Sequence, residues 1–169
     1  MPTFKRTYDK NEPNNGILVT MDDFQTISHA YRIMLKKLFD AVPNIDKEHS
    51  AIGGFSNGGY TTAVLLANQD EFIMQNFRSY FFIEGANPLA ANVLHKPAMR
   101  RNRYLVMRGN DFNGAAIREA NFHLDQALEL MAQEYNLDLE LIIMHGKKHE
   151  FPEEYAAQLS HWVRHHEFH

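Results

Sequence analysis

The sequence contains no cysteine in its 169 residues. This absence excludes disulfides, thiolate metal sites and a cysteine nucleophile, and nothing else in the sequence indicates a metal or another cofactor. No apolar run approaches the roughly 20 residues that a membrane-spanning helix needs, and the first residues, MPTFKR, lack the apolar segment of a signal peptide. We therefore expect a cytoplasmic protein that does not act at a membrane.

A large excess of charge of either sign is also missing. The formal net charge is −4 at pH 7 and the isoelectric point is about 6.2. Such a chain has no general attraction for phosphate backbones, so nucleic acid is not expected as a partner. Hydrophobic residues make up 44% of the chain, which supplies a core for one globular domain over residues 1–169.

Short apolar segments alternate along the chain with amphipathic segments of helical period. Strands are expected over residues 2–8, 50–54, 78–84, 103–108 and 137–144. Helices are expected from Asp22 to just before Pro43, and over residues 58–68, about 115–136 and from 152 onward. This order predicts an α/β fold, with a mainly parallel sheet of about five strands and helices on both faces. Residues 1–20 are then an irregular N-terminal strand and loop, and residues 85–102 an irregular or short-helical excursion.

The most informative segment reads GGFSNGG over residues 53–59. Within it, Gly54, Ser56 and Gly58 fit the pattern G-x-S-x-G, in which a serine occupies the apex of a tight turn from a strand into a helix. Glycines are needed on both sides because side chains there would clash as the strand and the helix fold against each other. The expected strand before Ser56 and the expected helix after it supply the right context. The alternative is a glycine-rich turn that only packs tightly or cradles a phosphate.

A serine hydroxyl is a weak nucleophile and needs a base that is itself oriented by an acid. In a parallel sheet, the loops after the carboxyl ends of the strands gather at one edge. Asp111 and His149 each follow an expected strand, and the order Ser56, Asp111, His149 is that of hydrolases with this serine turn. Glu84 is the alternative acid and His145 the alternative base. Asp111 could also be only a turn or helix-capping residue.

On these residues the chain resembles the α/β-hydrolase superfamily, particularly its esterases related to dienelactone hydrolases, feruloyl esterases and polyhydroxybutyrate depolymerases. The segments that carry the resemblance are DKEHSAIGGFSNGG (46–59), YLVMRGND (104–111) and residues 141–163, where Gly146 stands three residues before His149. The resemblance implies a serine esterase that acts on a small-molecule ester. It assigns the nucleophile to Ser56, the general base and acid to His149, and the orienting carboxylate to Asp111.

The resemblance also implies further parts of a site. The backbone N–H of Asn57 would be one donor of the oxyanion hole. Phe55, Phe112 and Phe151 flank the three candidate residues, as walls of an acyl pocket or as ordinary core aromatics. Residues 85–102 occupy the place where this superfamily often inserts a cap.

The chain departs from the superfamily before Ser56. Members have two or three more N-terminal strands, and one of these ends in a His-Gly-type loop that supplies a second oxyanion N–H. That strand and loop are not recognisable here, so the resemblance implies a truncated α/β-hydrolase fold. Loss of one oxyanion donor typically costs about 10²–10³ in turnover. The alternative function is therefore a non-catalytic or weakly active domain whose exposed sheet edge forms a homo-oligomer or binds a partner.

Overall fold

The computed structural model describes residues 19, 21–47, 49–85, 93–111 and 115–165, with the backbone alone over 115–121. Short helical turns lie at η1 (Met21–Asp23) and η2 (Pro97–Met99). The helices are α1 (Phe24–Ala41), α2 (Asn57–Ala67), α3 (Glu71–Asn76), α5 (Ala115–Tyr135) and α6 (Glu153–Arg164). The strands are β1 (Ala51–Phe55), β2 (Ser79–Ile83), β3 (Arg103–Gly109) and β4 (Asp138–Met144).

The four strands form one parallel sheet in the order β1-β2-β3-β4. This confirms the predicted α/β class, and each of these strands lies within one residue of its expected bounds. β3 is buried along its whole length, which explains why its sequence RYLVMRG shows no alternation of polar and apolar residues. The further strand expected over residues 2–8 lies outside the described residues.

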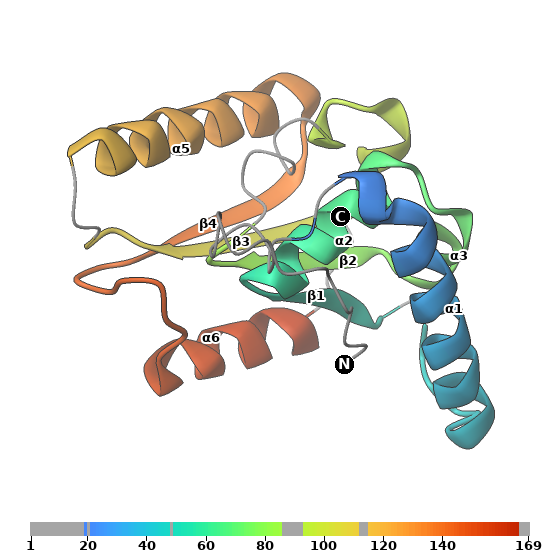
Figure 1. The fold of residues 1–169 in the computed structure, drawn as a ribbon. Helices are drawn as coiled ribbons and strands as arrows, with labels where there is room; N and C mark the ends of the chain where they lie inside the picture. The colour runs from blue at the N-terminus through green and yellow to red at the C-terminus, as the bar shows by residue number, and fades with distance from the viewer. Residues whose placement is uncertain (1–18, 20, 48, 86–92, 112–114, 166–169) are drawn as a thin grey trace, which may run out of the picture.

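Helices cover both faces of the sheet (Figure 1). Side chains alternate between the faces because successive residues of a strand point in opposite directions. On β2, Tyr80 and Phe82 join a core with α1, α2 and α5, whereas Phe81 and Ile83 join a smaller core under α6. The helices are therefore split between the two faces, as the alternation of elements predicts. In the described residues, no helix is long and apolar enough to cross a membrane.

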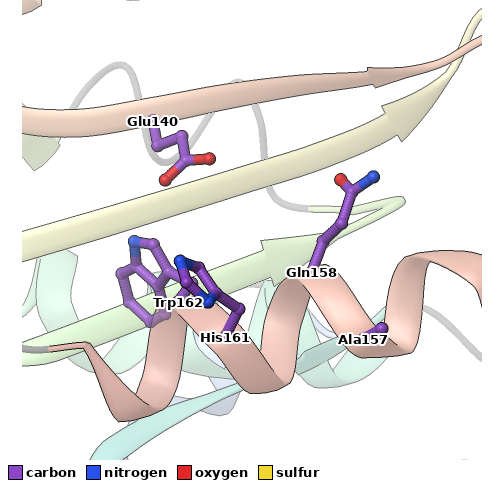
Figure 2. Close-up of a pocket in the computed structure, with 5 residues that line it drawn as sticks. All are labelled: Glu140, Ala157, Gln158, His161 and Trp162. Carbon is purple, nitrogen blue, oxygen red and sulfur yellow. The ribbon is translucent and has the colours of Figure 1, made fainter.

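The smaller core is closed by α6. Pro152 precedes this helix, and Tyr155, Leu159 and Trp162 pack onto the sheet at helical spacing. The guanidinium of Arg103 lies 4.6 Å from the centre of the Trp162 ring and donates to the carbonyls of Trp162 and His165. The C-terminal end of α6 is thereby fixed to β3. A hollow of about 350 Å³ lies between this helix and β4, lined by Glu140, Ala157, Gln158, His161 and Trp162 (Figure 2).

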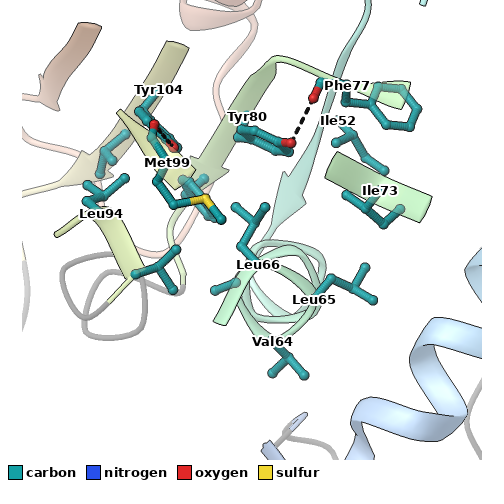
Figure 3. Close-up of a cluster of buried hydrophobic side chains, with 14 of the residues drawn as sticks. Ile52, Val64, Leu65, Leu66, Ile73, Phe77, Tyr80, Leu94, Met99 and Tyr104 are labelled. Carbon is teal, nitrogen blue, oxygen red and sulfur yellow. Dashed lines mark hydrogen bonds between the residues drawn. The ribbon is translucent and has the colours of Figure 1, made fainter. Parts of the chain in front are cut away.

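The larger core is centred on α2, whose residues Val64, Leu65 and Leu66 are fully buried (Figure 3). Tyr80 and Tyr104 stack beside it with ring centres 5.8 Å apart. The Tyr80 hydroxyl donates to the carbonyl of Phe77 at 2.8 Å, and the Tyr104 hydroxyl donates to that of Met99 at 2.7 Å. Burial raises the pKa of both phenols above the ordinary value, so both remain hydrogen-bond donors.

Three details differ from the expectations or extend them. Val93, Leu94 and Met99, from the expected excursion over 85–102, are buried in the larger core, while residues 86–92 lie outside the described residues. Helix α3 was not expected, although Asp70 accepts the N–H of Ile73 as a regular N-terminal cap. Leu38 was expected on the buried face of α1 but is 45% exposed, because that end of the helix extends past the sheet (Figure 1).

Removing the Tyr80 hydroxyl tests the polar bonds inside the larger core. In Tyr80→Phe the buried carbonyl of Phe77 loses its donor, which costs about 1–3 kcal/mol of unfolding free energy. Urea denaturation measures this loss. The control is Tyr60→Phe, because the Tyr60 hydroxyl makes no hydrogen bond to a described residue; equal stability losses in the two variants would contradict the prediction.

Candidate active site

Ser56 lies at the junction between β1 and α2 with φ of 52° and ψ of −118°. A positive φ is unfavourable for a residue with a side chain, and here the surrounding backbone enforces it. The Ser56 N–H donates to the carbonyl of Ile83 at 2.8 Å. A side chain on Gly54 would lie 2.7 Å from the backbone of Gly58, and one on Gly85 would overlap the Ser56 carbonyl. The turn has the strand-to-helix geometry that G-x-S-x-G predicts.

The loop that carries His149 is attached to the loop that follows β3. The side-chain oxygen of Asn110 accepts the N–H of Gly146 at 2.8 Å, and the Asn110 amide nitrogen lies 3.0 Å from Nδ1 of His145. The backbone N–H of Asp111 donates to the carbonyl of Lys147 at 2.9 Å. These bonds place the segment before His149 and give His145 a partner of its own.

His149 and Ser56 meet although they are 93 residues apart in the chain. Nε2 of His149 lies 2.9 Å from Oγ of Ser56, within hydrogen-bond distance. The ring of Phe55 lies 5.1 Å from the imidazole, centre to centre, and the Phe55 side chain is exposed. Phe151 packs instead into the smaller core under α6, and Phe112 lies outside the described residues.

The carboxyl group nearest to the imidazole belongs to Glu84. Its Oε2 lies 3.7 Å from Nδ1 of His149, which is within ion-pair range but longer than a hydrogen bond. Its Oε1 accepts the backbone N–H of Gly109, and the side chain is only 2% exposed. The structure does not bring Asp111 into the same position: its side chain is exposed and bonds to no residue in the described part of the chain.

The environment of Glu84 disfavours its charged form. Burial raises the pKa of this carboxyl to about 7, more than the Gly109 N–H and the Arg108 guanidinium lower it, and the charge of Glu150 raises it a little further. The Arg108 guanidinium is also paired with Asp125. Glu84 therefore titrates near neutral pH, next to the imidazole.

Asn57 begins α2 directly after Ser56. The first N–H groups of a helix have no acceptor within the helix and point out of its positive end, which suits a developing negative charge. The hollow between β4 and α6 is lined by none of the candidate site residues.

Gly85, Gly109 and Asn110 were not among the predicted site residues, yet they position those residues. Gly85 packs on the Ser56 carbonyl, and a side chain on Gly109 would overlap the carbonyls of Lys147 and Lys148. The only signal in the sequence was a Gly-Asn pair at a strand end, which is typical of a turn. That signal does not identify the second loop against which the turn packs.

No family model matches this sequence, and no curated protein does. Several solved structures are similar to this chain in fold. An uncharacterized protein from Bacillus cereus ATCC 10987 has a TM-score of 0.60 and 18% identity, over 88% of this chain and 47% of that protein. Arabidopsis thaliana SOBER1 has a TM-score of 0.56 and 14% identity, over 88% of this chain and 66% of SOBER1. A point variant of SOBER1 has a TM-score of 0.57 and 15% identity, over 88% of this chain and 67% of the variant.

The chain thus spans about half the length of the Bacillus cereus protein and about two thirds of SOBER1. At these identities the similarity shows the fold alone. That fold is of the α/β-hydrolase type, here in a truncated form with a four-stranded parallel sheet in the described residues. The similarity agrees with the type of fold suggested by the sequence and does not distinguish among the proteins that share this fold.

Substituting Gly109 tests whether contact between the two loops places His149. In Gly109→Ala the added methyl group overlaps the backbone of Lys147 and Lys148, so we expect a stability loss of about 1–3 kcal/mol and a displaced His149 ring. Histidine side-chain NMR signals and urea denaturation measure both effects.

The matched control is Gly146→Ala. This residue has φ of +70°, and nothing lies within 4 Å of the place that an added β-carbon would take, so the variant has backbone strain but no clash. An unchanged His149 signal in Gly109→Ala would refute the loop contact as the cause.

Glu84→Gln tests the raised pKa of the buried carboxyl. A group whose pKa rises on folding contributes stability that is complete below its ordinary pKa, near 4.5, and is lost as the pH rises through about 7. The neutral glutamine lacks this dependence. Between pH 4.5 and 8, the unfolding free energy of the variant should therefore rise by up to about 3 kcal/mol relative to that of the wild type. Urea denaturation across this range measures the gain, and Asp111→Asn serves as an exposed control. A difference that is constant with pH would count against a buried, titrating Glu84.

Proposed function

We propose that this protein is a serine esterase that works through an acyl-enzyme. The observation that carries the proposal is the 2.9 Å distance between the Ser56 hydroxyl and the His149 imidazole, at a turn whose backbone exposes the serine between a strand and a helix. A serine activated by a neighbouring histidine is the usual nucleophile of acyl transfer. The α/β-hydrolase type of fold supports this reaction class by analogy.

The reaction follows from the two side chains. Oγ of Ser56 attacks the ester carbonyl carbon while Nε2 of His149 takes the hydroxyl proton. The tetrahedral intermediate expels the alcohol, which receives that proton from His149, and an acyl group remains on Ser56. Water then attacks the acyl carbon with His149 as base, and the acid leaves as the Ser56 hydroxyl is restored. The N–H of Asn57 is the proposed donor to the oxyanion.

The substrate we propose is a small-molecule ester. The exposed ring of Phe55 lies against the imidazole and would contact the part of the substrate next to the scissile bond. The superfamily resemblance assigns similar roles to Phe112 and Phe151 and gives the orienting carboxylate to Asp111. The geometry around His149 favours a different carboxyl, that of Glu84.

Labelling with a fluorophosphonate tests this function, because the reagent forms a covalent bond only with an activated serine. Wild-type protein should label at one site and give a burst with an activated aryl acetate, whereas Ser56→Ala should not label and should lose at least about 10³-fold in turnover. Ser50→Ala is the control, since Ser50 precedes β1 and its hydroxyl bonds the carbonyl of Asp46. Folded wild-type protein that neither labels nor shows a burst would eliminate the esterase.

A second candidate function is favoured by the edge formed by β1. In the described residues this strand pairs with β2 on one side only, and its sequence AIGGF lacks the charges and prolines that usually protect an exposed edge. We propose, as the alternative, a weakly active or non-catalytic domain that forms a homo-oligomer or binds a partner through this edge. Monomeric light scattering at all concentrations, with turnover that depends on Ser56, would exclude it.

A further inference from the structure

Glu84 occupies an unusual place at the end of β2. Its φ is 51°, a value that is unfavourable for a residue with a side chain, and Gly85 after it packs on the Ser56 carbonyl. The left-handed conformation accompanies a side chain that is buried rather than directed into solvent: it is 2% exposed. One carboxyl oxygen accepts the N–H of Gly109, which leaves the other oxygen 3.7 Å from Nδ1 of His149.

Asp111 lies in a different environment. Its backbone N–H donates a hydrogen bond to the carbonyl of Lys147, while its carboxyl is exposed to water. An exposed carboxylate interacts weakly with a neighbouring cation because solvent screens the charge, and the interaction typically contributes only about 0–1 kcal/mol. A buried carboxylate interacts more strongly at the same distance because the surroundings have a lower dielectric constant.

We propose that Glu84, rather than Asp111, is the positioning residue that orients the His149 imidazole toward Ser56. The inference rests on the proposed esterase function and deepens it. The bond between the Gly109 N–H and Oε1 fixes the carboxyl, so that Oε2 faces Nδ1 of His149. The negative charge of the carboxylate favours a proton on Nδ1, the ring nitrogen on its side, and a neutral imidazole with its proton there has an unprotonated Nε2 that faces the Ser56 hydroxyl.

No covalent bond to Glu84 forms or breaks in this role. When Nε2 takes the proton of Ser56, the imidazole becomes a cation and the carboxylate stabilises it. The proton stays on His149 until the leaving alcohol, and later Ser56, takes it back. A protonated Glu84 would stabilise the cation far less, because a neutral carboxyl offers a dipole in place of a charge.

The titration of Glu84 should therefore appear in the pH dependence of turnover. The groups that face it are the Gly109 N–H, the Arg108 guanidinium, the Glu150 carboxylate and the His149 imidazole. With a pKa raised to about 7 by burial, the carboxyl is charged above that pH and neutral below it. Turnover should fall as the pH drops through 7, because the imidazolium then lacks its charged partner.

Glu84→Gln and Asp111→Asn compare the two carboxyls in the full-length chain, with an activated aryl acetate as substrate. Glu84→Gln should lower kcat by about 10²–10⁴-fold with KM nearly unchanged, since the imidazolium forms only in the transition state. It should also lose the component of the pH profile near pH 7. Asp111→Asn should lower kcat by less than about tenfold and keep that component. Glu129→Gln, which removes an exposed charge from α5, is the neutral control.

Glu84→Asp distinguishes a role of the carboxylate charge from a purely structural role of the Glu84 side chain. It restores the charge with a shorter side chain, so turnover should recover part of the loss seen in Glu84→Gln, and the dependence on pH should return. A large loss of kcat in Asp111→Asn with near wild-type kcat in Glu84→Gln would overturn the proposal. So would a Glu84→Gln variant that keeps the wild-type pH profile.

Two independent measurements separate this proposal from the esterase function. If the wild-type protein is not labelled by a fluorophosphonate, the proposed function fails. The positioning role is then judged from ¹⁵N NMR of the His149 ring, whose tautomer should change in Glu84→Gln and remain in Asp111→Asn. An unchanged ring in Glu84→Gln overturns the role of Glu84 whether or not the protein hydrolyses esters.

Discussion

The backbone of Ser56, with its positive φ, is the constraint on which the rest of the site depends. It turns the chain from β1 into α2 within one residue, so the hydroxyl lies at the end of the sheet and the helix begins immediately after it. Such a turn requires close approach of three backbone segments, which Gly54 and Gly85 allow because they lack side chains. The 2.9 Å contact between Ser56 and His149 exists only because this turn and the loop after β4 end at the same edge of the sheet.

The sequence predicted most of this arrangement. Apolar segments of the right length identified four strands, and the glycines around Ser56 identified the sharp turn, because both features follow from local chemistry. Parallel strands then bring the segments after them to one edge, so Ser56 and His149 could be expected near each other. The protrusion of α1 beyond the sheet could not be predicted. Leu38 follows the helical spacing of the buried residues of α1, and its exposure depends on how far the sheet extends.

The sequence alone does not determine whether Glu84 or Asp111 approaches the imidazole. Both residues follow a strand, so both lie at the correct edge, and spacing alone does not decide which carboxyl reaches the imidazole. The decision comes from tertiary contacts. Gly109 donates its N–H to Glu84. The backbone of the next residues bonds to the loop of His149, and the Asp111 side chain is exposed to water. The sequence indicates neither contact, apart from a glycine and an asparagine at the end of a strand.

Ser56 and Glu84 share an unfavourable backbone conformation. They follow adjacent strands, and both have positive φ, at 52° and 51°. Glycine would adopt either conformation without strain, and each side chain in this region costs on the order of 1 kcal/mol or more. Glu84 carries a second cost, because its carboxyl is buried and its pKa is raised to about 7. Two unfavourable side chains, placed on either side of one imidazole, are what a site that needs a hydroxyl and a carboxyl would retain.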